Sequence, residues 1–191
     1  MSNSTRTIAA AAAAILTGAA QADLMGTSMD MELVQSGFAG NMAGPTGGSY
    51  TYGTLDTFGI DELFTWDVVS PGLHPAFDNS ILLDFSNFGY AAYIALGPSI
   101  STLDVTNIAE DVEIASPAVF LLSDLNTNIA QSTSTLGNSF SVGWDVETVI
   151  NGNPLAPSVI VGWNSAPVPA PGAMALLGLA GLTVIRRRRR C

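Results

Sequence analysis

Carboxylates are the side chains of this sequence that could do chemistry, and three groups of them lie close together along the chain. The groups are Asp56, Asp61 and Glu62, then Glu110, Asp111 and Glu113, and finally Asp78 with Asp84. Calcium takes six to eight oxygen ligands, largely carboxylates and carbonyls, which loops between strands can supply. The first two groups are therefore the candidate calcium ligands, although the sequence holds no EF-hand loop and no nonapeptide calcium repeat.

Enzymatic chemistry has little support in the sequence. His74 is the lone histidine, in the loop Pro71-Gly72-Leu73-His74-Pro75, and neither a Gly-x-Ser-x-Gly elbow nor a His-Glu-x-x-His motif accompanies it. We expect a histidine whose hydrogen bonds are satisfied within its loop, since a triad needs a base beside an activated nucleophile. Paired carboxylates roughly 5 to 10 Å apart could hydrolyse glycosidic bonds, but no such pair stands out. A secreted glycoside hydrolase is therefore the second alternative to a structural or adhesive protein, after a glycan-binding module.

Short strands predict the scaffold that positions these groups. Phe64, Trp66 and Val68 alternate with Thr65 and Asp67, and Ile81, Leu83 and Phe85 alternate with Leu82 and Asp84. Ala118 to Leu122 is a short apolar run. The clearest alternation places Phe140, Val142, Trp144 and Val146 on one face, followed after a turn-rich connection by Val159, Val161 and Trp163. The last two runs predict an antiparallel hairpin with both tryptophans towards the core. The pattern predicts an all-β fold, an antiparallel β-sandwich or jelly roll.

Several segments have other expected roles. Gly37 to Gly53 is glycine-rich and predicts loop and turn, with an edge strand near Tyr50 to Tyr52. One helix is expected near Asn107 to Val112, and Pro167 to Pro171 predicts a stiff spacer. The three tryptophans Trp66, Trp144 and Trp163 could stack on a sugar, but their alternation with polar residues favours packing in the core.

The charges of the chain are segregated. All six basic residues are Arg6 and Arg186 to Arg190, and all sixteen Asp and Glu lie between residues 23 and 166. This body therefore has a formal charge of −16 with His74 neutral, and nucleic acid is excluded as a partner. Cys191 is the only cysteine, so the body has no disulfide and no thiolate metal site. Hydration, counterions, backbone amides or a bound metal must make the carboxylates tolerable. A salty medium that screens the charges is the plain explanation, and bound calcium is the more specific one.

The C-terminal segment predicts attachment to a membrane. Ala173 to Ile185 is an uncharged run of thirteen residues, and the segment from Pro169 to Ile185 is seventeen residues long. That length is the lower limit for a helix that crosses a hydrocarbon core of about 30 Å. Arg186, Arg187, Arg188, Arg189 and Arg190 follow at once and predict a cytoplasmic end, which places the body on the far side of the membrane.

Proline, a short apolar run and an arginine cluster at the extreme C-terminus resemble the PEP-CTERM sorting domain. The resemblance covers only Val168 to Arg190, with Val168, Pro169, Ala170, Pro171 and Gly172 at the motif, where alanine replaces the family's usual glutamate. It implies export from a Gram-negative-type bacterium, transient anchoring in the inner membrane, and processing by an exosortase-like enzyme near Pro-Ala-Pro.

The N-terminus predicts export independently. Arg6 supplies a positive charge, Ile8 to Leu16 an apolar stretch, and Ala20-Gln21-Ala22 a small-x-small site for signal peptidase, with cleavage before Asp23. The expected organisation is a signal peptide over 1–22, an acidic β-sandwich over 23–166 and a sorting and anchor segment over 167–191. The expected role is a structural or adhesive component of the cell surface or extracellular matrix, with exopolysaccharide as a candidate partner. A calcium-assisted glycan-binding module is the first alternative.

Overall fold

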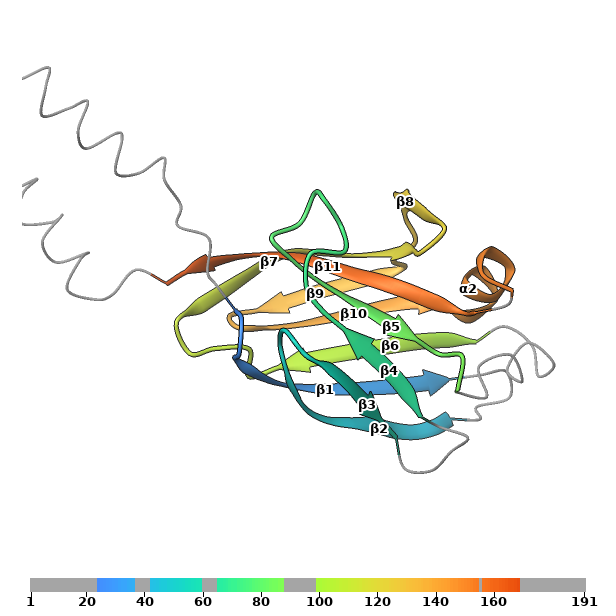
Figure 1. Cartoon of the computed structure of the whole chain (residues 1–191), viewed down its shortest axis with the longest axis horizontal. Coiled ribbons are helices and arrows are strands. Elements are labelled where there is room, and N and C mark those ends of the chain that lie inside the picture. Colours follow the sequence, from blue (N-terminus) through green and yellow to red (C-terminus); the bar gives the residue numbers. More distant parts are fainter. Residues whose placement is uncertain (1–23, 37–41, 60–64, 88–98, 155, 169–191) are drawn as a thin grey trace, which may run out of the picture.

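The structure is a computed structural model that describes residues 24–36, 42–59, 65–87, 99–154 and 156–168. These residues form two antiparallel sheets (Figure 1), which confirms the predicted all-β fold. Sheet A has the order β2-β1-β6-β10-β9 and sheet B the order β3-β4-β5-β11-β7-β8. The strands of sheet A are β1 (Ser28–Ser36), β2 (Met42–Thr51), β6 (Ile100–Thr106), β9 (Ser132–Leu136) and β10 (Ser139–Asp145). Those of sheet B are β3 (Leu55–Phe58), β4 (Trp66–Val69), β5 (Asn79–Asp84), β7 (Val112–Leu121), β8 (Asp124–Asn128) and β11 (Ser158–Pro167).

The hydrophobic core lies between the two sheets, because alternation along each strand sends every second side chain inward. On β1, Met29, Met31 and Leu33 are buried, whereas Ser28 and Glu32 are exposed. Both sheets contribute aromatic side chains to this core, and all three tryptophans are fully buried: Trp66, Trp144 and Trp163. Core packing of the tryptophans is thereby confirmed, and none of them is available to stack on a sugar.

The predicted hairpin near the C-terminus is wrong. β10 lies between β6 and β9 in sheet A, while β11 lies between β5 and β7 in sheet B. A short helix, α2 (Val146–Gly152), connects them, and it begins where the Asp145 carboxylate accepts a hydrogen bond from the Thr148 N–H at 2.9 Å. An N-cap of this kind satisfies an otherwise unpaired helical N–H. The helix carries the chain from one sheet to the other, so Trp144 and Trp163 meet the same core from opposite sides.

Two further predictions fail for local reasons. The glycine-rich segment is not mainly loop, because Met42–Thr51 forms the ten-residue strand β2 paired with β1. The edge strand expected near Tyr50 to Tyr52 is the last part of β2, which does lie at the edge of sheet A. The expected helix near Asn107 to Val112 is a turn followed by β7. Asn107 has a positive φ of 57°, which a helix does not tolerate, and the Ile108 N–H donates to the Asn138 carbonyl instead of to a preceding turn.

A loop between β4 and β5 covers part of the outward face of sheet B. His74 in this loop is buried and stacks on Phe120 of β7, with ring centroids 4.1 Å apart. Phe77 lies over Gly162 of β11, where a Cβ atom would come within 2.7 Å of the phenyl ring. Glycine at position 162 therefore makes room for Phe77, and the loop is fixed to the sheet by aromatic contacts.

Strand β11 reaches the beginning of the predicted sorting segment. Pro167 pairs with Val112, and the Val168 N–H donates to the Asp111 carbonyl at 2.7 Å, so the first residues of the predicted spacer belong to the sheet. The predicted signal peptide, its cleavage site and residues 169–191 lie outside the described residues. Within the described ranges, no helix has the length and apolar character that crossing a membrane requires.

Candidate functional site

Carboxylates gather on the outward face of sheet A, on strands that neighbour each other. Asp30 and Glu32 lie on β1, where they alternate with the buried methionines, and Asp104 lies on β6 between Leu103 and Val105. Glu32 stands directly opposite Asp104 in the register of β1 and β6. Directly opposed residues of an antiparallel pair have Cβ atoms about 5 Å apart, so these two carboxylates are close neighbours. We call Asp30, Glu32 and Asp104 the acidic face.

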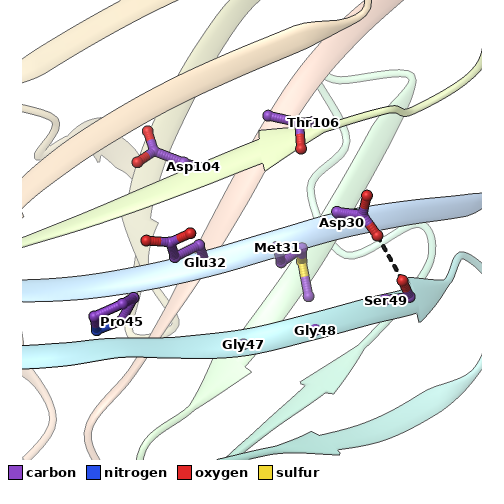
Figure 2. Close-up of a pocket in the computed structure, with 9 residues that line it drawn as sticks. All are labelled: Asp30, Met31, Glu32, Pro45, Gly47, Gly48, Ser49, Asp104 and Thr106. Carbon is purple, nitrogen blue, oxygen red and sulfur yellow. Dashed lines mark hydrogen bonds between the residues drawn. The ribbon is translucent and has the colours of Figure 1, made fainter.

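A cavity of about 430 Å³ lies on this face (Figure 2). Figure 2 shows β1 with Asp30 and Glu32 in the middle, β6 with Asp104 on one side of it, and β2 with Gly47 and Gly48 on the other. The cavity is lined by Asp30, Met31, Glu32, Pro45, Gly47, Gly48, Ser49, Asp104 and Thr106. A second hollow of about 200 Å³ shares Asp104 and Thr106 with the first and continues over β10 and β9, where Ser134, Ser139 and Ser141 line it. The outward face of sheet A thus presents carboxylate and hydroxyl oxygens side by side.

Gly47 determines how closely β2 approaches β1 at this cavity. A Cβ atom at position 47 would lie 1.9 Å from the Met31 carbonyl oxygen and 2.8 Å from its carbonyl carbon. Both neighbours are backbone atoms and cannot rotate away. At Gly48, by contrast, a Cβ atom would meet only the Phe58 ring at 3.6 Å, an ordinary van der Waals contact. Glycine at position 47 therefore lets β2 lie close to β1 beside the cavity.

Hydrogen bonds hold Asp30 in its ionised form. The Ser49 hydroxyl donates to Oδ1 at 2.5 Å, and the Asn107 side-chain amide donates to Oδ2 at 2.7 Å. These two bonds, Ser49 first, lower the pKa of Asp30 below its ordinary value. A carboxylate with a lowered pKa stabilises the fold above its unfolded value of about 4, and this contribution is lost as the pH falls through the folded-state pKa.

We expect the substitution Ser49→Ala to raise the pKa of Asp30 towards its ordinary value, because it removes the larger of the two stabilising bonds. The loss of stability should appear above about pH 4 and vanish in more acidic solution, where Asp30 is protonated in both states. A ¹³C NMR titration of the Asp30 carboxyl group measures the shift. Thr127→Ala is the matched control, because the Thr127 hydroxyl bonds Asp124 and lowers the pKa of that residue instead. An unchanged Asp30 titration in Ser49→Ala would contradict the assignment.

Glu32 and Asp104 face each other without a basic side chain to balance them. The body from residue 23 to 166 contains no lysine and no arginine, so a side-chain salt bridge to either is excluded within it. Like charges placed directly opposite each other on adjacent strands are destabilising. Solvent counterions or a bound cation must therefore compensate this pair.

The carboxylates singled out in the sequence are distributed elsewhere. Asp56 lies half-buried on β3 in sheet B, while Asp61 and Glu62 lie outside the described residues. Glu110 and Asp111 are exposed in the turn between β6 and β7, and Glu113 is exposed on β7. Across the part of the chain that the structure describes, no three His, Cys, Asp or Glu residues are grouped so that they could hold a metal ion.

The third predicted group is also separated. Asp84 on β5 stands opposite Asp67 of β4, and Asp78 is exposed in the loop before β5. The sequence reasoning missed both opposed pairs, Glu32 with Asp104 and Asp67 with Asp84, because their members are distant along the chain. Alternation with buried residues was the available signal, since it marks each of these acids as facing outward from its strand.

His74 has the partners expected of a satisfied loop histidine. Its Nε2 lies 2.7 Å from the Leu125 carbonyl oxygen, and its Nδ1 accepts a hydrogen bond from the Ala76 N–H at 3.2 Å. The carbonyl requires a proton on Nε2 and the N–H requires a lone pair on Nδ1, so the neutral Nε2–H tautomer fits both. His74 therefore fastens its loop to β8 and to the aromatic ring of Phe120.

The chain matches no protein-family model, no curated protein and no solved structure.

Proposed function

We propose that this protein is an exported bacterial surface or matrix component with a structural or adhesive role and no catalytic activity. A signal peptide over 1–22 delivers it, and a segment resembling PEP-CTERM holds it in the inner membrane until an exosortase-like enzyme processes it. The observation that carries the proposal is the segregation of charge. Every basic residue lies in the two terminal segments, and the body between them has sixteen acids and no lysine or arginine.

The described strands run from Ser28 of β1 to Pro167 of β11, so all of their residues but Pro167 lie within the segment that we assign to the body.

Fractionation of a bacterium with an exosortase-type system tests the proposal. The full chain should appear at the surface or in the medium in a form shortened at both ends. Replacing Arg186 to Arg190 together by glutamine should abolish retention and processing, because the cytoplasmic stop is lost. Replacing the same five residues by lysine is the matched control and should behave as the wild type. Full-length protein found in the cytoplasm would contradict the proposal.

The acidic face favours a second candidate function, a calcium-assisted glycan-binding module. The opposed pair Glu32 and Asp104 lines a cavity, and the body has no lysine or arginine to neutralise it. No third acidic side chain is grouped with this pair among the described residues, so water would supply most of the remaining oxygen ligands. Calcium bound there would replace the missing cation and present open coordination positions to sugar hydroxyls. The hollow beside it is lined by Leu136 and Phe140 as well as by serine and threonine hydroxyls, and these hydroxyls provide further partners for a polyhydroxylated ligand. The buried tryptophans take no part in this arrangement.

Thermal unfolding of residues 23–168 in calcium chloride and in sodium chloride at matched ionic strength tests this candidate. A bound cation stabilises the folded state by RT ln(1 + [L]/Kd), about 2.7 kcal/mol at 100 times Kd. A calcium-specific rise in melting temperature should be lost in Asp104→Asn and kept in Glu113→Gln, which removes an exposed acid from sheet B. Equal rises in the two salts would mean screening alone and would leave the structural role in place.

A further inference from the structure

Both described ends of the chain leave the fold at the same end of the sandwich. At the start, the Gly26 N–H donates to the Tyr52 carbonyl at 2.8 Å, which ties the segment before β1 to the turn between β2 and β3. At the finish, Val168 is bound to Asp111 in the turn between β6 and β7. Figure 1 shows the beginning of β1 and the tip of β11 at this end, with α2 and the β7–β8 turn at the other. We call the end with Gly26, Tyr52, Asp111 and Val168 the chain-exit end.

Little chain separates this end from the proposed anchor. The uncharged run begins at Ala173, five residues beyond Val168. Five residues span at most about 17 Å when fully extended. The opposite end of the sandwich is about 33 Å away, since β11 has ten residues at roughly 3.3 Å each. We call the segment from Val168 to Ala173 the tether, and its greatest length is about half the length of the sandwich.

The short tether keeps the chain-exit end next to the bilayer, and the charge of the two broad faces opposes tilting of the sandwich onto either face. Sheet A presents the opposed pair Glu32 and Asp104 outward, and sheet B presents the opposed pair Asp67 and Asp84 on its own outward side. Lying on either face would bring such a pair within a Debye length, about 10 Å at 0.1 M salt, of anionic lipid headgroups. Both broad faces are therefore repelled by an anionic bilayer.

We propose that the chain-exit end faces the lipid bilayer and that the sandwich stands upright on it, with its strands close to the membrane normal. This inference rests on the anchor of the proposed function. Glu110, Asp111 and Glu113 are exposed near the chain-exit end, so this end is held at the length of the tether and is not inserted. The acidic face then lies along the side of the anchored protein, open to solvent, and α2 points outward.

Energy transfer from single dyes to labelled lipid headgroups tests the orientation in the full chain. Cys191→Ser removes the native thiol, and Leu136→Cys and Leu122→Cys provide a matched pair of labelling sites. Leu136 is 84 % exposed beside the β9–β10 turn at the chain-exit end, and Leu122 is 48 % exposed in the β7–β8 turn at the opposite end. The Ile114 N–H of β7 donates to the Gly137 carbonyl in the β9–β10 turn, so this turn lies at the level of Ile114. Leu122 is eight residues beyond Ile114, which corresponds to about 25 Å along an extended strand. Glu32→Cys reports on the broad face of sheet A.

In vesicles of phosphatidylethanolamine and phosphatidylglycerol, transfer should be strongest from position 136, intermediate from position 32 and weakest from position 122. The distances of the dyes at positions 136 and 122 from the headgroups should differ by about 25 Å. This difference should become smaller on vesicles of phosphatidylcholine alone, because these carry no net charge and do not repel the broad faces. Equal transfer from the three positions, or strongest transfer from position 32, would overturn the upright orientation. Protein that fails to float with either kind of vesicle would overturn the anchor, and with it the inference.

Discussion

Replacement of Gly47 by alanine destabilises the fold by about 3 kcal/mol, the upper part of the range for overpacking in a close-packed region. The added Cβ atom lies 1.9 Å from the Met31 carbonyl oxygen, so β2 has to move away from β1. This movement weakens the register between Gly47 and Glu32 and changes the shape of the cavity. For a chain of this size, a loss of 3 kcal/mol lowers the melting temperature by about 6 to 12 °C.

Gly48→Ala is the matched control for this experiment. Its new methyl group meets the Phe58 ring at 3.6 Å, without overlap, and we expect a change within about 0.5 to 1 kcal/mol. Urea unfolding of both variants, followed by circular dichroism, gives the two free energies. If Gly47→Ala were as stable as Gly48→Ala, the close approach of β2 to Met31 would be wrong.

Trp163→Ala has the largest expected effect, a loss of about 3 to 5 kcal/mol. Trp163 is fully buried on β11 and joins the two sheets, because its ring centroid lies 5.2 Å from that of Phe140 on β10 and 5.9 Å from that of Tyr52. Alanine would leave a cavity between the sheets that the surrounding side chains only partly fill. The T-shaped aromatic contact between Tyr52 and Trp163 would be lost as well.

Trp163→Phe keeps an aromatic ring and removes the indole N–H, so it distinguishes the contribution of the ring from that of the N–H. Among the described residues, the buried Trp163 Nε1 has no hydrogen-bond partner. Removing this N–H therefore costs no bond, and we expect a loss below about 1.5 kcal/mol, as for other swaps that keep most of the volume. Leu136→Ala, at an 84 % exposed position, should be close to neutral. Denaturant unfolding ranks the three variants, and a Trp163→Phe loss as large as that of Trp163→Ala would show that Nε1 has a partner, such as a bound water.

The strand content and the inward residues were predictable from the sequence because they follow from a local rule. Alternation with a period of two places Phe140, Val142 and Trp144 on one face of a strand, whichever sheet that strand joins. The same rule identified Val159, Val161 and Trp163 as inward-facing, and the structure buries all of them. Burial of the tryptophans was thus settled without knowledge of the topology.

Pairing between strands was not predictable, since it depends on residues far apart in the chain. The runs ending in Trp144 and starting at Val159 had the pattern of a hairpin, and only the packed structure shows that α2 passes the chain from sheet A to sheet B. Of strand β2, only the end near Tyr50 was predicted, because glycines have a low strand propensity. Pairing with β1 overrides that propensity, and the close contact at Met31 requires a glycine there.

The sequence by itself determined which residues face inward, that the body carries sixteen acids without a lysine or arginine, and where the signals for export are expected. These properties depend on composition and on neighbours a few residues apart. Only the tertiary structure decided that Glu32 meets Asp104 at a cavity, that the predicted acidic groups stay apart, and that both described ends of the chain leave together. The reason is that strand pairing joins residues 72 positions apart, and no local pattern records the register of that pairing.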